Sequence, residues 1–405
     1  MNARLRVEAK GLMSAAPDVI AGRPQLMRAM NEELLVNALR RNGPLTRADL
    51  TQLSGLSKPT VGLALANLEA NGLLGVVGQR SGSRGPAAAL YGVHPDAGYV
   101  LSLDVGSEYV RGALADLSGA VRARGQRSVH AASTKERMSG LVHLADELAE
   151  RAGVARGSVT QTIVGSPGVY DHQRDALVLA LGLPGWQDPG VLGELRRAFG
   201  EETLVENDVN LAALAERDHG HGRDVESFAF VSVGTGVGMG LVLNGRLHTG
   251  EHGAAGEVGF LPLGTPHSER TPDARRRGML EASASAAGVV RAARAKGMRG
   301  RLNAHRVFDL AASGDWRAKA VVAETASLIA RALAAVVAVA DPSLIVLGGG
   351  IGSASLFADA VSTELHRIVP IAPDVKVSAI AENAVADGGI VAGVDAAWRR
   401  LLSGT

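Results

Sequence analysis

The chain has 405 residues, which is too long for one ordinary domain, and at 46% hydrophobic and 20% charged residues it can bury large cores. It contains no cysteine, which excludes disulfides, thiol catalysis and cysteine-ligated zinc and fits a reducing cytoplasm. The first residues lack the apolar core of a signal peptide, and no apolar run reaches about 18 residues, so we expect no membrane segment.

The charge is unevenly distributed along the chain. Residues 1–95 hold 11 Lys and Arg against 6 Asp and Glu, a net charge of +5, whereas the remainder holds 31 against 35, a net charge of −4. A basic amino-terminal segment on a mildly acidic body indicates that only the segment meets a polyanion. The alternative is ordinary variation of surface charge, so the inference depends on the motif that this segment carries.

The amino-terminal segment divides into an unpatterned stretch and a folded domain. Residues 1–30 show no sustained periodicity and contain Pro17, Gly22 and Pro24, so we expect a flexible arm. Residues 31–93 predict three helices followed by a β-hairpin. The helices begin at the capping residues Asn31, Thr46 and Ser57 and end at Asn42 and Gly43, at Ser54 and Gly55, and at Asn71 and Gly72.

Two of these helices, joined by a tight glycine turn, have the form of a helix-turn-helix that seats its second helix in the major groove of DNA. The first turn of that helix offers hydroxyl groups, a lysine and a helix N-terminus to phosphates and base edges: Ser57, Lys58, Pro59 and Thr60. The hairpin has strands over 73–77 and 88–93, and its loop carries Arg80 and Arg84, which suit the minor groove. The pattern predicts a winged helix-turn-helix; the alternative is a three-helix protein-interaction module.

Four buried strands in the remaining chain end in glycine turns, at 104–107, 165–168, 234–240 and 348–350. The turns at 104 and 234 share the form strand, polar residue, glycine turn, strand, and such turns present backbone N–H groups to phosphates. The repetition predicts a duplicated α/β lobe with a nucleotide between the copies. Its phosphates would lie at Asp104, Gly106, Gly234, Thr235 and Gly236. The alternative is that the turns need glycine for tightness alone.

Eight segments carry a resemblance to a known family: 103–106, 165–168, 183–186, 206–210, 234–240, 253–259, 279–281 and 348–350. From about Leu26 to the C-terminus, the chain resembles the ROK family (repressors, open reading frames, kinases) in its NagC/XylR-type repressor branch. The resemblance implies an α/β protein with an N-terminal winged helix-turn-helix and an actin-like ATPase domain of two lobes, as in ROK sugar kinases. We expect the first lobe over 97–205 with 385–405 and the second over 206–384.

The resemblance also implies a sugar site. In kinases of this family the aspartate of an Asn-Asp pair takes the proton from the sugar hydroxyl, and Asp208 holds this catalytic position, which we expect to be vestigial here. Asn207, Asp208, Glu257 and Glu281 match the sugar-binding residues, and adjacent polar side chains bind neighbouring hydroxyls well. The alternative for any one of them is a surface side chain without a ligand.

The chain departs from the kinases at the first phosphate turn, where Ser107 and Glu108 replace a glycine and a threonine. Ser107 adds a side chain where the backbone should approach the phosphate. Two like charges about 4 Å apart repel by roughly 4 kcal/mol at an effective dielectric near 20, so Glu108 opposes phosphoryl transfer. Asp104 retains a carboxylate that can hold Mg²⁺, so the sequence leaves ATP and Mg²⁺ binding open.

The family's structural zinc ligands, one histidine and three cysteines, correspond to Phe260, Pro272, Ala274 and Met279 here, so we expect no structural zinc. The lost histidine also helps to hold sugar in kinases, so Phe260 changes that part of the site. The arginines of 275–277 occupy the same loop. A solvated basic run is the first interpretation, and contact with an anionic ligand or with DNA is the alternative.

Taken together, these patterns predict a cytoplasmic transcription regulator and not an enzyme. Its winged domain would bind palindromic double-stranded operator DNA of carbohydrate genes, usually as a repressor, and a sugar or sugar phosphate in the lobed domain would change that affinity. We expect a homodimer or a dimer of dimers and no membrane association. The alternative is an ATP-dependent ROK-type sugar kinase that carries an extra DNA-binding domain, which Asp208 favours.

Overall fold

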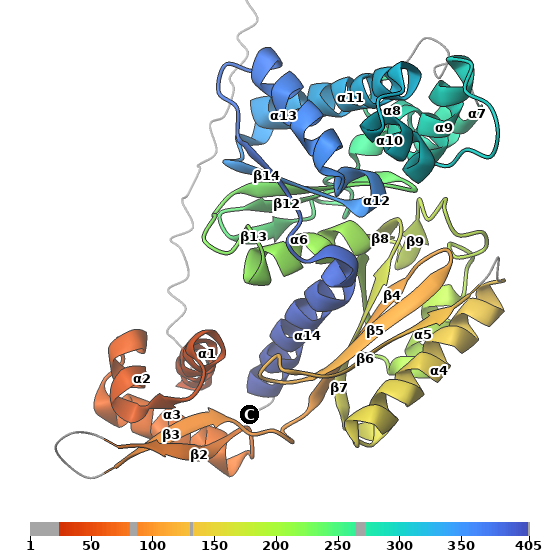
Figure 1. The fold of residues 1–405 in the computed structure, drawn as a ribbon. Helices are drawn as coiled ribbons and strands as arrows, with labels where there is room; N and C mark the ends of the chain where they lie inside the picture. Colours follow the sequence, from red (N-terminus) through yellow and green to blue (C-terminus); the bar gives the residue numbers. More distant parts are fainter. Residues whose placement is uncertain (1–23, 82–86, 130–132, 265–271, 404–405) are drawn as a thin grey trace, which may run out of the picture. The chain divides into compact units, whose positions relative to one another are not determined.

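The computed structural model describes residues 24–81, 87–129, 133–264 and 272–403. The chain forms two compact units (Figure 1). The first comprises Met1–His94 with Leu401–Thr405 and is called the head here. The second comprises Pro95–Arg400 and is called the body.

The described part of the head contains three helices and a three-stranded antiparallel sheet in the order β1-β3-β2. The elements are α1 (Pro24–Asn42), β1 (Leu45–Thr46), α2 (Arg47–Ser54), α3 (Lys58–Ala70), β2 (Leu74–Arg80) and β3 (Ala88–Val93). One apolar residue or more from each helix is buried, and the core includes Leu35, Leu50, Val61, Leu65 and Leu68. The winged helix-turn-helix expected from the sequence is therefore the fold of this unit.

The head differs from the expectation at two places. Residues 24–30 belong to helix α1 and not to a flexible arm, because a proline is favoured in the first turn of a helix, where its missing N–H has no partner to lose. Strand β2 continues to Arg80, which pairs with Ala88, so Arg80 lies at the end of a strand and not in the loop. Arg84 lies outside the described residues.

Local capping sets the helix-turn-helix. Thr46 and Asp49 form a capping box at the start of α2, and Gly55 ends that helix in the left-handed conformation with φ 69°. Ser57 then caps α3. These short-range bonds explain why the sequence located both helices to within one residue.

The body consists of two α/β lobes, each built on a five-stranded sheet. The first lobe contains β4 (Tyr99–Val105), β5 (Tyr109–Asp116), β6 (Val121–Ser128), α4 (Thr134–Ala152), β7 (Val159–Ser166), β8 (Val169–Asp171), β9 (Ala176–Val178), α5 (Val191–Phe199) and β10 (Leu204–Asn207). The second contains α6 (Asp208–His219), β11 (Phe228–Val233), β12 (Val237–Leu243), β13 (Arg246–His248), α7 (Pro272–Arg277), α8 (Met279–Ala284), α9 (Ala286–Ala295), α10 (Ala304–Ala312), α11 (Trp316–Ala340), β14 (Leu344–Gly348), α12 (Gly349–Gly352), α13 (Ser355–Ile368) and β15 (Asp374–Val377). Helix α14 (Ala384–Ser403) closes the chain.

The two sheets are copies of one pattern. Their strand orders are β10-β7-β4-β5-β6 and β15-β14-β11-β12-β13. In each sheet the first three strands in the chain are antiparallel neighbours, and the next two extend the sheet in parallel. This repetition is the duplicated lobe of an actin-like ATPase fold. The expected lobe boundary after residue 205 differs slightly, because Glu206 and Asn207 still pair with β7.

Helices α6 and α14 lie between the two sheets, whereas α4 and α5 cover the opposite face of the first sheet (Figure 1). Helix α6 packs Ala212, Ala213 and Ala215 with Phe228 and Phe230 of the second sheet. Its Leu211 and Leu214 pack with Ile163 of the first sheet and Val391 of α14. Helix α6 therefore contacts both lobes.

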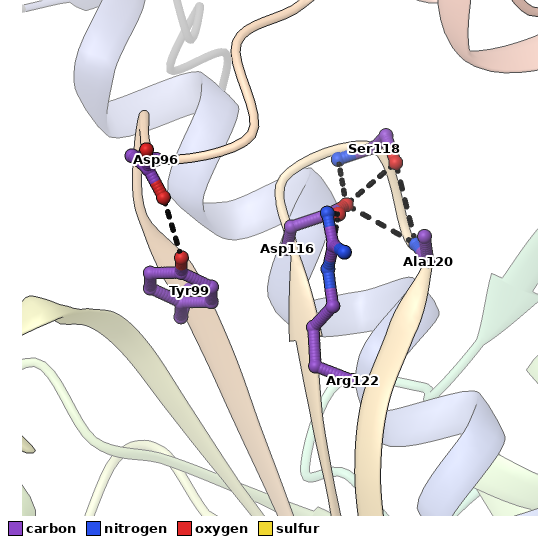
Figure 2. Close-up of polar contacts among 6 residues, drawn as sticks. All are labelled: Asp96, Tyr99, Asp116, Ser118, Ala120 and Arg122. Carbon is purple, nitrogen blue, oxygen red and sulfur yellow. Dashed lines mark hydrogen bonds and ion pairs between the residues drawn. The ribbon is translucent and has the colours of Figure 1, made fainter. Parts of the chain in front are cut away.

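Polar contacts fix the turn between β5 and β6 at the start of the body (Figure 2). Asp116 is buried and accepts hydrogen bonds from the backbone N–H groups of Ser118 (2.8 Å) and Ala120 (3.2 Å), and it forms an ion pair with Arg122. Nearby in Figure 2, the Tyr99 hydroxyl donates to Asp96 at 2.9 Å. The Asp116 carboxylate thus supplies the hydrogen-bond acceptors that the tight turn between β5 and β6 needs.

Helix α11 is long and apolar enough to cross a membrane by length and composition. Most of that window is buried inside the body, and Val321, Leu328 and Leu333 belong to the core of the second lobe. The helix is therefore explained as a core helix.

Candidate functional site

The first turn of α3 is open to solvent in the head. Ser57, Lys58 and Pro59 are exposed, and Thr60 is half-buried. Ser57 Oγ accepts the backbone N–H of Thr60 at 3.3 Å and lies 2.8 Å from Thr60 Oγ1, so the two hydroxyls fix the helix start. Lys58 and the helix N-terminus are the groups that this turn offers to a phosphate.

Arg80 of the wing is bound to helix α2. Its Nη1 donates to Asp49 Oδ2 at 2.8 Å, and the same carboxylate oxygen accepts the backbone N–H of Thr46 at 3.0 Å. The hydrogen bonds from Thr46, together with Arg80, hold the pKa of Asp49 below its usual range. Arg80 therefore ties the wing strand to the helix, and a DNA contact from it stays a prediction.

In the body, Asn207 and Asp208 form the start of helix α6. Asn207 Oδ1 caps the helix by accepting from the backbone N–H groups of Val209 (2.9 Å) and Asn210 (3.2 Å), and its Nδ2 donates to the Gly168 carbonyl at 2.8 Å. The amide is thus largely occupied within the protein, and one N–H remains for a ligand. Asp208 follows at the first helical position.

Glu257 and Glu281 approach each other from two segments of the second lobe. Gly278, with φ 91°, precedes α8, and a Cβ there would overlap the Gly259 carbonyl, so this close approach needs glycine. Glu281 Oε2 accepts the backbone N–H of Val237 at 3.1 Å. Glu281 therefore rests on the 234–237 turn, next to Glu257.

The structure brings together four carboxylates that the sequence singled out: Asp104, Asp208, Glu257 and Glu281. We call them the acidic cluster. Burial raises the pKa of Asp208 to about 7, with the charge of Asp104 as the next cause and that of Glu257 adding to it. Burial also raises the pKa of Asp104 to about 6, and it raises those of Glu257 and Glu281. Raised carboxyl pKa values are typical of functional sites.

The two glycine turns satisfy much of their own hydrogen bonding. Gly106 N–H donates to the Tyr109 carbonyl at 3.0 Å, and Gly234 N–H donates to the Gly236 carbonyl at 2.9 Å. Glu281 takes the N–H that follows the second turn, and Thr235 is exposed at its tip. The phosphate-binding role predicted for these residues stays a prediction.

Glu108 is exposed in the first turn, so water screens its charge and the repulsion expected from the sequence is weaker. Two arginines that the motifs did not include contact Gly106 and Asp104 at this turn. Arg137 is buried and donates to the Gly106 carbonyl at 2.6 Å, and Arg111 forms an ion pair with Asp104 at 3.8 Å. The sequence signal that could have identified Arg111 is a charged residue among the small, mainly apolar residues of β5.

The loop that corresponds to the zinc loop carries α7. Arg276 Nη2 donates to the Leu181 carbonyl of the first lobe at 3.1 Å, and Arg277 Nη1 lies 3.6 Å from Glu281 Oε1. The run of 275–277 is thus partly engaged with the body and not only solvated. Phe260 is 42% exposed, and within the described residues no group of three His, Cys, Asp or Glu is placed to hold a metal ion. The absence of zinc stays a prediction.

Comparison with known proteins identifies relatives of two kinds. The xylose repressor of Bacillus subtilis is 22% identical over 237 residues, which are 58% of this chain and 61% of that repressor. The N-acetylmannosamine kinase of Escherichia fergusonii is 31% identical over 270 residues, which are 66% of this chain and 88% of that kinase. This chain therefore spans less than two thirds of the repressor and most of the kinase.

Solved structures give the same fold. The crystal structure of a ROK family transcriptional regulator, described as a homolog of the Escherichia coli Mlc protein, superposes with a TM-score of 0.76 at 23% identity. The match covers 93% of this chain and 98% of the regulator. The sequence profile of the ROK family matches residues 100–400, which is most of the chain. The chain belongs to the ROK family.

Proposed function

We propose that this protein is a sugar-responsive transcription regulator, usually acting as a repressor. The head binds palindromic double-stranded operator DNA, and the body binds a sugar or sugar phosphate at the acidic cluster. The protein works as a homodimer or a dimer of dimers in the cytoplasm. Effector binding changes the preferred arrangement of the lobes and thereby the affinity of the paired heads for DNA.

The observation that carries the proposal is the presence of a winged helix-turn-helix on a ROK body. The N-acetylmannosamine kinase matches only 66% of this chain, although 88% of the kinase is covered. The regulator structure matches 93% of this chain. The head, with its exposed Lys58 at the start of α3, is the part a kinase would not need. Xylose repressors are among the relatives, which supports a sugar as effector.

The DNA-binding part is tested on duplexes selected from a random library with the full-length protein. Fluorescence anisotropy at several salt concentrations then gives the affinity and its salt slope. Lys58→Ala should weaken binding and reduce the log–log slope by about one unit, because one phosphate contact is lost. Lys319→Ala, an exposed lysine of α11 in the body, is the matched control and should change neither. Failure to select any duplex would contradict the proposal.

The effector part is tested by thermal shift with a panel of hexoses, pentoses, amino sugars and their phosphates. The stabilising sugar should lose its effect in Glu257→Gln, since the variant lacks the carboxylate that accepts sugar hydroxyls. Glu201→Gln, an exposed residue of the first lobe, is the control. We avoid Asn207→Ala here because it also removes the cap of α6. A sugar shift that Glu257→Gln leaves unchanged would place the effector elsewhere.

The second candidate is a ROK-type sugar kinase with an added head. The raised pKa of Asp208, about 7, favours it, because a general base works best when its pKa lies near the operating pH. A coupled assay with ATP across the same sugars decides between the two. Turnover that disappears in Asp208→Asn would establish the kinase, and no turnover with any sugar supports a regulator.

A further inference from the structure

Strand β5 carries an arginine, Arg111, directly opposite Asp104 of β4. Residues paired across antiparallel strands project from the same face of the sheet. Arg111 Nη1 lies 3.8 Å from Asp104 Oδ2, and the guanidinium lies 5.5 Å from the centre of the Tyr109 ring. The Nε atom of Arg111 is buried and has no hydrogen-bond partner in the described structure.

The fold family implies a nucleotide with Mg²⁺ at this turn, so the residues present must be tested against that group. Mg²⁺ needs a free carboxylate oxygen at about 2.1 Å and keeps several waters. Here the carboxylate of Asp104 already faces a guanidinium, which cannot lose its proton and which repels a second cation. The Gly106 N–H is bound to the Tyr109 carbonyl and is not available to a phosphate. These residues do not fit a magnesium–nucleotide complex.

We propose that the guanidinium of Arg111 takes the place of a divalent cation beside Asp104, so that the body binds its ligand without metal or nucleotide. Asp104 is buried and Asp208 is half-buried, and the two carboxylates are close enough for their negative charges to repel. Such a pair requires a nearby cation or a proton. Arg111 supplies one positive charge that is covalently fixed to the strand.

The buried Nε–H of Arg111 also defines the class of ligand. An unpaired buried donor gains a full hydrogen bond when a ligand brings an acceptor oxygen to it. Because Asp104 beside Arg111 belongs to the acidic cluster, the site favours an uncharged polyhydroxyl compound over an anion. The hydroxyl groups of such a compound would donate to the carboxylates, and one would accept from Nε. This ligand assignment rests on the proposed sugar response, whereas the replacement of the cation does not.

The test measures Mn²⁺ binding to the full-length chain by electron paramagnetic resonance, with and without the ATP analogue AMPPNP. For the wild type we expect only free Mn²⁺. Arg111→Met removes the charge and keeps a long apolar side chain beside Tyr109. We expect this variant to gain one saturable Mn²⁺ site per chain that the wild type lacks, because two neighbouring carboxylates have lost their cation. Adding Asp104→Asn should abolish the gained site.

Two controls separate the local charge from the net charge. Arg111→Lys keeps a cation on β5 and should gain no Mn²⁺ site. Arg127→Ala removes an arginine of β6, in the same sheet, that pairs with Glu147 of α4, and it should gain no Mn²⁺ site either. If Arg111→Met does not fold, as judged by circular dichroism, titration of the wild type and Arg111→Lys decides, because a saturable Mn²⁺ site in either overturns the proposal.

Other outcomes also overturn it. A folded Arg111→Met protein that binds no Mn²⁺ would show that Arg111 is not what keeps the cation out. A variant that loses binding of sugar phosphates but keeps binding of free sugars would show that Arg111 binds the phosphate of an effector. DNA is absent from all these measurements, so this proposal and the proposed regulator can fail separately.

Discussion

The polar side chains at the acidic cluster differ in the charge and the hydrogen bonds that their surroundings favour. Asp104 faces an arginine, whereas burial and the nearby carboxylates favour a neutral Asp208. The side chain of Asn207 caps helix α6, which carries Asp208, and also donates to the Gly168 carbonyl. Residues that the same motifs single out thus differ in protonation and in the hydrogen bonds left for a ligand, and these differences depend on their partners in space.

Asp208 makes the stability of the protein depend on pH. Its pKa is about 7 in the folded chain and 3.8 without burial, so the folded state holds a proton that the unfolded chain has released. The stability from this proton is complete below about pH 4 and is lost as the pH rises through 7. At about 1.4 kcal/mol for each pKa unit, Asp208→Asn should stabilise the protein by up to roughly 4 kcal/mol at pH 8 and by much less at pH 5.

The measurement is thermal unfolding of wild type and Asp208→Asn across this range, and Asp359→Asn, at an exposed position of α13, is the control. Parallel curves for wild type and Asp208→Asn would contradict the raised pKa.

The exposed side chain of Leu63 leads us to expect that the head distinguishes thymine from other bases. It is 64% exposed on α3, about one and a half turns from the exposed Lys58, and a large apolar side chain in water adds nothing to the stability of the head. An apolar side chain in the major groove contacts the methyl group of thymine. Replacing thymine by uracil at one operator position should therefore weaken binding about fourfold, the value of one buried methyl at about 0.8 kcal/mol.

The same replacement of thymine by uracil should not change the DNA affinity of the Leu63→Ala variant. Anisotropy with singly substituted duplexes gives the comparison, and equal affinity for every uracil duplex would remove Leu63 from base recognition.

At the scale of elements, the position of α14 between the sheets depends on a close helix contact. A Cβ at Gly388 would overlap the backbone carbonyl of Leu211 in α6, and a Cβ at Gly389 would overlap the side-chain hydroxyl of Ser102 in β4. The helix therefore touches both the strand that carries Asp104 and the helix that carries Asp208. This packing gives the two halves of the acidic cluster a common support.

Gly388→Ala should destabilise the body by about 1–3 kcal/mol, because the added methyl group overlaps backbone that cannot move away. Gly193→Ala in α5 is the matched control, since its Cβ would meet nothing closer than Arg197 Nη1 at 3.7 Å. A helical glycine replaced by alanine in open space gains about 0.5–1 kcal/mol. Denaturant unfolding should move the two variants in opposite directions, and equal stability would show that α14 can shift freely.

At the scale of the whole molecule, the proposed regulator combines a DNA-binding head with a two-lobed body. A homodimer with two-fold symmetry binds half-sites that lie about one helical turn apart, or a multiple of it. Inserting about 5 base pairs between the half-sites should abolish tight binding because it turns one half-site to the opposite face of the duplex. Inserting about 10 should restore part of it. Anisotropy on the selected operator measures this, and equal affinity for all spacings would contradict a symmetric dimer.

The sequence alone determined the features that short-range rules control. Capping residues and glycine turns fixed α2 and α3, because a cap acts within one helical turn. The glycine-marked ends of β4, β7, β11 and β14 fixed the duplicated lobe, and the four carboxylates came from motifs within it. The start of α1 at Pro24 does not follow from these rules, since proline is found both where helices end and where they begin.

The tertiary structure alone decided which groups face each other. Glu108, only four residues from Asp104, is exposed, whereas Arg111 lies beside Asp104 because β4 and β5 pair in that register. Burial then raised the pKa values of the cluster, and burial depends on α6, α14 and both sheets together. Sequence patterns report neighbours along the chain, but charge and desolvation act between neighbours in space, which strand register and helix packing determine.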